Sequence, residues 1–174
     1  MSTVSRTIIG IDPGSRITGY GIIVVTGSAM KALAFGHIPC KQETLSGRLH
    51  HIYTELGAIL TEFAPSEAAI EQIFTCKNAQ SALKLGHARG AALVALAGFG
   101  LEAEDYSARQ VKQAVVGTGA ADKKQVQHMI RCLLNLSAPC QADAADALAI
   151  AVCHANTQAW AEKIKKATTL AGAK

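Results

Sequence analysis

The stretch IIGIDPG, at residues 8–14, is an apolar run that stops abruptly at an acid. A continuous apolar run of this kind is typical of a strand that is buried on both faces. Pro13 favours extended geometry for Asp12, and Gly14 permits a tight turn at which a ligand can approach the backbone closely. The stretch therefore predicts a buried strand with a carboxylate at its end. Since a simple Asp-Pro-Gly turn explains the same residues equally well, the rest of the chain has to decide.

Three further carboxylates can reach the same point. Glu71 ends a second apolar run, AAIEQ at residues 68–72, where an unpaired carboxylate would be costly. Asp143 and Asp146 lie three residues apart in an alanine-rich helical pattern and hence share one helix face, although the helix dipole alone would also favour acids in a first turn. Four clustered carboxylates repel one another unless a cation binds, and oxygen ligands without Cys or His favour Mg²⁺ or Mn²⁺. The group predicts a metal-dependent enzyme that acts on phosphate, and it suits phosphodiester hydrolysis with two ions per site.

The composition is that of one globular domain of 174 residues, 49% of them hydrophobic and 17% charged. No apolar run reaches the ~18 residues that a membrane span needs, and the amino terminus lacks the apolar segment of a signal peptide. Five cysteines without a Cys-x-x-Cys pair predict reduced thiols, so we expect a cytoplasmic protein that contacts no membrane. The net charge is +4, and with four acids assigned to a metal site the remaining surface is positive, as for a polyanion-binding protein.

The periodicity of the chain predicts an α/β fold. Strands are expected at residues 7–12, 18–25, 30–39, 68–72 and 101–106, and helices at 46–63, 79–97, 107–116, 122–134 and about 141–154. The short connections between the first three strands indicate an antiparallel meander. This order fits a ribonuclease-H-like mixed five-stranded sheet flanked by helices. We expect a single domain at residues 1–157 and a Lys- and Ala-rich tail at 158–174 that frays. Gly86 and Gly90, inside one helix, indicate close packing against the sheet or a second subunit.

Five motifs resemble those of the RuvC family of bacterial Holliday-junction resolvases: IGIDPGS at 9–15, IEQIF at 70–74, SALKLG at 81–86, RQVKQ at 109–113 and QADAADALA at 141–149. The likeness extends from about residue 7 to residue 154, with the motifs in the family's order. It implies a ribonuclease-H-like nuclease domain, a homodimer, and Mg²⁺-dependent nicking of two opposing strands at a four-way DNA junction, with Mn²⁺ as a substitute. It also implies a branch-migration motor of the RuvA and RuvB type as partner, which no residue here establishes.

The resemblance also implies roles for individual residues. The family's catalytic, metal-binding acids correspond to Asp12, Glu71, Asp143 and Asp146, its two active-site lysines to Lys112 and Lys123, and the aromatic that wedges against junction bases to Phe74. Without the resemblance, a core position would be the better interpretation of Phe74. Further candidates for DNA contacts, beside the two lysines, are Lys77, Asn78, Lys84 and Arg89, which would position phosphates without reading sequence. Whether Lys123 or a water activated by the metal is the proximate base stays open.

Three other interpretations remain at this point. The GIDPG segment also resembles the first phosphate loop of actin-like ATPases and sugar kinases, but those proteins need a second glycine-rich loop and a longer chain. A junction-binding protein whose acids are structural would bind DNA without cutting it. Another ribonuclease-H-like nuclease acting on RNA, or a transposase-like strand transferase, would use similar carboxylates.

Overall fold

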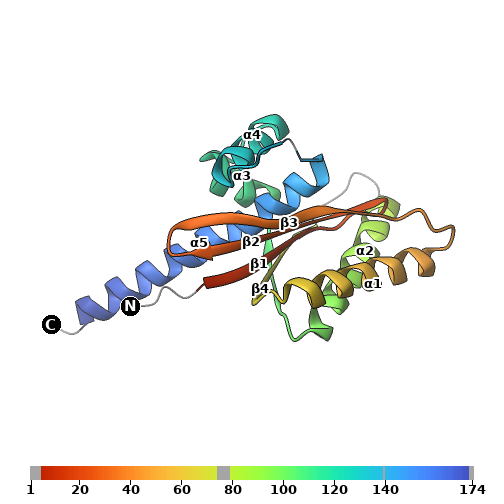
Figure 1. Cartoon of the computed structure of the whole chain (residues 1–174), viewed down its shortest axis with the longest axis horizontal. Helices are drawn as coiled ribbons and strands as arrows, with labels where there is room; N and C mark the ends of the chain where they lie inside the picture. Colours follow the sequence, from red (N-terminus) through yellow and green to blue (C-terminus); the bar gives the residue numbers. More distant parts are fainter. Residues whose placement is uncertain (1–4, 74–78, 139, 173–174) are drawn as a thin grey trace.

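The computed structural model describes residues 5–73, 79–138 and 140–172 (Figure 1). At its centre is a five-stranded sheet in the order β3-β2-β1-β4-β5. The strands are β1 (Ser5–Asp12), β2 (Ile17–Thr26), β3 (Ala29–Pro39), β4 (Glu67–Glu71) and β5 (Ala103–Tyr106). The first three strands form an antiparallel meander, whereas β4 runs parallel to β1 and β5 parallel to β4. The predicted meander and mixed sheet are confirmed.

Helices cover both faces of the sheet (Figure 1). The helices α1 (Leu45–Phe63) and α2 (Ala79–Gly98) pack on one face, and α3 (Ala108–Val116), α4 (Lys123–Leu133) and α5 (Ala142–Gly172) lie on the other. Successive residues of a strand point to opposite faces, so β1 contributes Ile9 and Ile11 to the α1 side and Ile8 to the α5 side. The same alternation directs Asp12, at the end of β1, to the α5 face.

Capping residues define where three of the helices begin. The side chain of Thr44 accepts a hydrogen bond from the backbone N–H of Gly47 at 3.1 Å, at the start of α1. Ser107 forms a capping box with Gln110 at the start of α3, and Asp122 forms the equivalent box with Gln125 at the start of α4. The two boxes define the first turns of the helices that carry Lys112 and Lys123.

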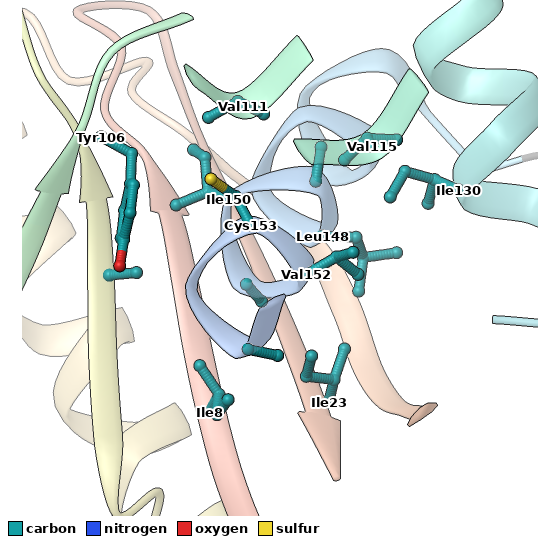
Figure 2. Packing of buried hydrophobic residues seen from close by; sticks show 14 of the residues in the cluster. Ile8, Ile23, Tyr106, Val111, Val115, Ile130, Leu148, Ile150, Val152 and Cys153 are labelled. Atoms are coloured by element: carbon teal, nitrogen blue, oxygen red, sulfur yellow. The ribbon is translucent and has the colours of Figure 1, made fainter. Parts of the chain in front are cut away.

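The carboxyl-terminal helix α5 forms the centre of one hydrophobic core (Figure 2). Its residues Leu148 and Val152 are fully buried, between Ile23 of the sheet and Val115 of α3 and Ile130 of α4. A helix enclosed on several sides must be apolar nearly all round, and small where it touches the strands. This requirement explains the alanines that surround Asp143 and Asp146 in the sequence.

Glycines in β1 and β2 bring α5 into direct contact with the sheet. Gly10 and Gly21 are cross-strand partners. A Cβ atom at Gly10 would lie 2.2 Å from the carbonyl oxygen of Ala147, and one at Gly19 would lie 2.1 Å from the carbonyl oxygen of Asp143. No other residue fits such spacing without a shift of the helix. The first turns of α5 are thereby held directly over the ends of β1 and β2.

The helix α5 is longer than the sequence pattern predicted. The expected end near residue 154 is wrong, because α5 continues to Gly172. Residues 142–171 contain neither glycine nor proline, and their alanines and lysines favour a helix, so nothing in the sequence ends it earlier. The other predicted bounds agree with the structure to within two residues. The division of the chain at residue 157 stays a prediction.

The glycines of α2 do not pack against the sheet. A Cβ atom at Gly86 or Gly90 would meet nothing within 4 Å, so that part of the prediction is wrong and a second subunit remains the other alternative. These glycines share the outer face of α2 with Leu83 and Val94, which are each 61% exposed. Within the described residues, no helix is both long and apolar enough to cross a membrane.

Candidate active site

The strands β1 and β4 end side by side, and each ends in an acid. Ile11 pairs with Ile70 in parallel register, so the next residues, Asp12 and Glu71, are neighbours at the same edge of the sheet. Both side chains are half-buried and hydrogen-bonded to each other. The sequence predicted two strand-end carboxylates, and the sheet topology brings them together.

The first turns of α5 add the other two acids. Asp12 pairs with Gly19 across β1 and β2, and the carbonyl group of Asp143 lies directly over that glycine. Glu71, Asp146 and Asp143 all act electrostatically on Asp12 and raise its pKa. The structure therefore brings all four predicted carboxylates to one corner of the molecule, where strand ends meet a helix start.

The electrostatics of this corner are those of a site that needs a cation. Burial, followed by the charge of Glu71, raises the pKa of Asp12 to about 8. Burial also raises the pKa of Glu71, while its hydrogen bond with Asp12 and the two nearby lysines act in the opposite direction. The proton shared by the two acids therefore resides on Asp12 at neutral pH. A divalent cation at this corner would stabilise the ionised form of both acids.

Lys123 supplies part of the missing positive charge. Its Nζ atom lies 2.6 Å from Oδ2 of Asp146, and the side chain of Asp146 is 28% exposed. This hydrogen bond raises the pKa of Lys123, so the lysine is fully charged at neutral pH. Lys123 follows the N-cap residue of α4, and the helix start fixes where its side chain emerges.

A cavity of about 220 Å³ lies beside the acids, between α3, α4 and α5. Its polar lining consists of Glu71, Asp146, Lys112 and Lys123, and its walls are apolar, with Val111 and Ile150 among them. Two acids and two lysines from four separate elements thus face one space. Both lysines and two of the four acids that the resemblance implied thus line one cavity.

The donor set of this corner fits a hard divalent cation. Carboxylate oxygens are the ligands that such ions take. The raised pKa of Asp12 reflects its burial first and the negative charge of the three neighbouring acids second. Within the part of the chain that the structure describes, however, no three acid, His or Cys side chains are close enough to form a complete set of ligands. The carboxylates would have to rotate toward an ion in order to hold it.

The predicted DNA contacts fall into three groups. Phe74, Lys77 and Asn78 lie outside the described residues. Lys84 is exposed on α2, beside Arg48 and Leu49 of α1. Arg89 is directed inward: it bonds to Asp105 and to the backbone of Glu71, on the side of the sheet away from the carboxylates. Of the lysines, Lys112 and Lys123 line the cavity.

Gly10, Gly19 and Gly21 are site residues that sequence reasoning did not single out. They have no chemistry of their own, but they set the distance between α5 and the sheet. A signal was present: glycines inside two adjacent apolar strands, spaced to share one face, mark a close backbone approach.

Comparison with known proteins decides the family. A sequence model of crossover junction endodeoxyribonuclease RuvC matches residues 8–154. Crossover junction endodeoxyribonuclease RuvC of Coxiella burnetii is 58% identical over 167 residues, which cover 96% of this chain and 97% of that protein. The same enzyme of Vibrio vulnificus is 56% identical over 150 residues, covering 86% and 87% of the two chains. The chain belongs to the RuvC family.

Solved structures of RuvC agree with this assignment. The structure of Thermus thermophilus RuvC in complex with a Holliday junction substrate matches with a TM-score of 0.83 and 35% identity, covering 88% of this chain and 94% of that one. The yeast mitochondrial Holliday junction resolvase Ydc2 shares the fold, with a TM-score of 0.64 at 12% identity. The predicted RuvC family, the ribonuclease-H-like fold class and the endonuclease activity are confirmed, and the ATPase, RNA-directed and non-enzymatic interpretations are set aside.

Proposed function

We propose that this chain resolves four-way DNA junctions by symmetric, metal-dependent nicking of two opposing strands, in recombination and repair. The observation that carries the proposal is the meeting of Asp12, Glu71, Asp143 and Asp146 at one corner, beside Lys112 and Lys123, in a member of the RuvC family. Divalent metal dependence follows from the family. The substrate class is supported by the junction bound to the matching Thermus thermophilus enzyme.

The four acids are the ligands of two Mg²⁺ ions in this proposal, with Mn²⁺ as a substitute. Such ions supply a water of lowered pKa as nucleophile and stabilise the charge on the leaving oxygen. Asp12, whose pKa is raised to about 8, loses its proton when the site is loaded. Asp12 and Glu71 then no longer share a proton, and the oxygens of both are free to turn toward the cation.

The lysines bind the negative charge that develops on the phosphate. Lys123 holds Asp146 at 2.6 Å in the structure, and a loaded Asp146 would release it toward the scissile phosphate. Lys112 lines the same cavity from α3. Two lysines from separate helices that line one cavity can orient one phosphate. Of the two candidates for the proximate base, the charged state of Lys123 beside Asp146 favours a water activated by the metal.

Contacts with the junction lie around this corner. We assign Phe74, as a wedge against junction bases, with Lys77 and Asn78, to the segment that follows β4. Exposed Lys84 on α2 contacts backbone phosphates. Phe74 is only three residues from Glu71 in the sequence, which supports a role beside the acids.

A homodimer, formed through the outer face of α2, sets two such sites on one junction. Four residues of this face follow one another at helical spacing: Leu83, Gly86, Gly90 and Val94. Among the described residues, a Cβ atom added at either glycine would meet nothing within 4 Å, and Leu83 and Val94 are largely exposed. Two copies of this face permit close approach of two helices about a two-fold axis. A two-fold pair of sites matches the symmetry of a four-way junction.

The replacement Gly90→Leu tests this interface. Because a Cβ at residue 90 meets nothing within 4 Å, the single chain tolerates leucine, whereas a paired helix would clash. We expect the variant to be a folded monomer in light-scattering measurements and to lose paired nicking. Ala58→Leu, at an exposed position of α1, is the matched control and should remain dimeric. A dimeric Gly90→Leu variant would place the interface elsewhere.

The wider setting of the enzyme completes the proposal. A branch-migration motor of the RuvA and RuvB type delivers the junction, and the enzyme works in the bacterial cytoplasm, where its DNA is. Residues 1–157 form the nuclease domain, and residues 158–174 are an appendage to it. Each of these statements rests on the family and on the composition of the chain.

Cleavage of synthetic DNA tests the central claim. A mobile four-way junction and a linear duplex of the same sequence are incubated with and without Mg²⁺, with the Asp12→Asn variant in parallel. Paired, symmetric nicks that occur only in the junction, only with metal and only with the native Asp12 support the proposal. Tight junction binding without cleavage under any metal would refute the nuclease function of this chain.

A further inference from the structure

Arg89 lies behind the active site, on the opposite side of the sheet from the carboxylates. It extends from α2, which packs with α1 against the face formed by Ile9 and Ile70. Its Nε atom donates to the backbone carbonyl oxygen of Glu71 at 3.4 Å, and Nη2 donates to Oδ1 of Asp105 at 2.5 Å. The guanidinium group therefore joins α2 to the last residue of β4 and to the penultimate residue of β5.

The carbonyl group that Arg89 holds belongs to Glu71, one of the four acids proposed as metal ligands. Glu71 is the last residue of β4, and it pairs with Tyr106 at the final rung of the parallel ladder, where the N–H of Gln72 donates to the carbonyl oxygen of Tyr106 at 2.8 Å. The position of a carboxylate at a strand end depends on the position of the backbone to which it is attached. Charged donors to that backbone restrict its movement.

Arg89 is committed to these contacts in the structure. Its side chain is only 21% exposed, and it satisfies two acceptors on two strands at once. An arginine can do this because its planar guanidinium group presents several donors in a fixed geometry. To contact a phosphate, Arg89 would have to release Asp105. The structure thus favours an internal role over the DNA contact predicted from the sequence.

We infer that Arg89 is a positioning residue, which holds Glu71 from behind the sheet and makes the metal affinity of the site depend on the placement of α2. This inference rests on the proposed metal-binding function of Glu71. Arg89 acts on Glu71, a proposed ligand of the metal, and a replacement at residue 89 leaves the proposed DNA-contact residues in place. Metal affinity and junction affinity should therefore respond differently to changes at residue 89.

Three variants test the inference: Arg89→Ala, Arg89→Lys and Asp105→Asn. Lys31→Ala, an exposed residue of the distant edge strand β3, is the control for loss of one positive charge. Binding of Mn²⁺ to the DNA-free protein is followed by electron paramagnetic resonance of the free ion. Junction affinity is measured separately in EDTA, and thermal unfolding reports whether each variant is folded.

The expected result is a selective loss of metal affinity. Loss of a residue that orients a metal ligand weakens metal binding about tenfold or more, and we expect this of Arg89→Ala, with junction affinity in EDTA changed by no more than about twofold. Arg89→Lys should recover part of the loss, because lysine keeps the charge but not the fork that reaches both acceptors. Asp105→Asn should lie between Arg89→Lys and the native protein.

Two results would overturn the inference. Unchanged Mn²⁺ binding with weakened junction affinity would make Arg89 a DNA contact, and unchanged values for both would leave it no role in the site. If Arg89→Ala does not fold, the Mn²⁺ and junction affinities of Arg89→Lys and Asp105→Asn decide. Weaker Mn²⁺ binding with unchanged junction affinity in these variants supports the inference, and unchanged Mn²⁺ binding overturns it. Failure of the native protein to cut a junction would refute the proposed function alone, because the Mn²⁺ titration needs no cleavage.

Discussion

The strand β4 carries a glutamate at each end, and the two side chains have opposite electrostatic environments. Glu67, at the amino end, is bonded to His154 Nε2 at 2.9 Å and to Arg6 Nη1 at 3.3 Å. Glu71, at the carboxyl end, instead faces Asp12, and burial raises the pKa of both. One end of the strand has its negative charge matched by partners on neighbouring elements, and the other end accumulates negative charge.

The matched end is a closed network of hydrogen bonds. His154 is 3% exposed, and its Nδ1 lies 3.0 Å from the hydroxyl group of Tyr106. Because the carboxylate of Glu67 only accepts, Nε2 of a neutral His154 carries the proton, and Nδ1 accepts from Tyr106. Burial raises the pKa of Tyr106 to about 12, so its hydroxyl group keeps its proton. His154 is therefore a core residue with both ring nitrogens hydrogen-bonded.

The contrast shows which carboxylates serve stability and which serve chemistry. Burying a carboxylate without a partner costs free energy, so a protein keeps such a group where a ligand will supply the missing charge. We therefore expect changes at the carboxyl end of β4 to affect cleavage, and changes at its amino end to affect folding. The predictions below separate the two ends.

The largest effect is expected at Glu71. Replacement by glutamine removes a ligand for the metal and should reduce single-turnover cleavage of a four-way junction by about a thousandfold, the scale of losing a group that stabilises the transition state. Glu67→Gln is the matched control on the same strand, and its cleavage rate at a temperature where it is folded should stay near that of the native protein. Equal losses in the two variants would contradict the division between the ends.

The next effect is expected at Lys123, which supplies positive charge at the carboxyl end. Lys123→Ala should slow single-turnover cleavage by about a hundredfold, with junction binding largely retained, because the group acts on developing charge. Lys124→Ala, on the adjacent exposed residue of α4, should cleave at close to the native rate. If both variants lose the same amount, general attraction of DNA explains the lysine better than a role in the site.

At the amino end, the expected effect is on stability. Glu67→Gln replaces the charged partner of Arg6 and His154, and should lower the free energy of unfolding by about 1–3 kcal/mol, the range for disrupting hydrogen bonds to a charged group. Urea denaturation of the metal-free protein at pH 7 measures this change. Unaltered stability would show that the network is replaceable by water.

The smallest effect has the opposite sign. Asp12 has a pKa of about 8 in the folded protein and 3.8 as its ordinary value, so the folded state binds more protons between these values. Stability of the metal-free protein should accordingly fall as pH rises from about 4 to 8, and Asp12→Asn should remove this fall. At pH 8 we expect the free energy of unfolding of the variant to exceed that of the native protein by about 1–2 kcal/mol, which is the equivalent of roughly one pKa unit.

Comparison of urea denaturation at pH 4 and pH 8 measures the effect, which should be small at the lower pH, because pH 4 lies close to the ordinary pKa of 3.8 that Asp12 has in the unfolded chain. Saturating Mg²⁺ should stabilise the native protein and not the variant. A variant less stable than the native protein at pH 8 would mean that ionised Asp12 has a partner that stabilises it.

Much of this architecture could be predicted from local patterns in the sequence. The apolar runs that end at Asp12 and Glu71 identified two strands and their terminal acids. An apolar run and the acid that follows it are neighbours in the chain, so both can be recognised from the sequence. The helical periodicity of residues 107–116 and the alanine-rich pattern around Asp146 located two helices. The end of α5 was missed, since a run with high helix propensity carries no stop signal until Gly172.

The sequence by itself determined the strands, the helices, the four acids and, through its motifs, the family. Only the tertiary structure decided how α5 meets the sheet, where Gly10, Gly19 and Gly21 set the separation, and only there did Arg89 prove to bind the back of Glu71. It also left the outer face of α2 uncovered. The physical reason is that propensity and polarity act between neighbours in the chain, whereas close approach and charge pairing act between residues that only the folded backbone brings together.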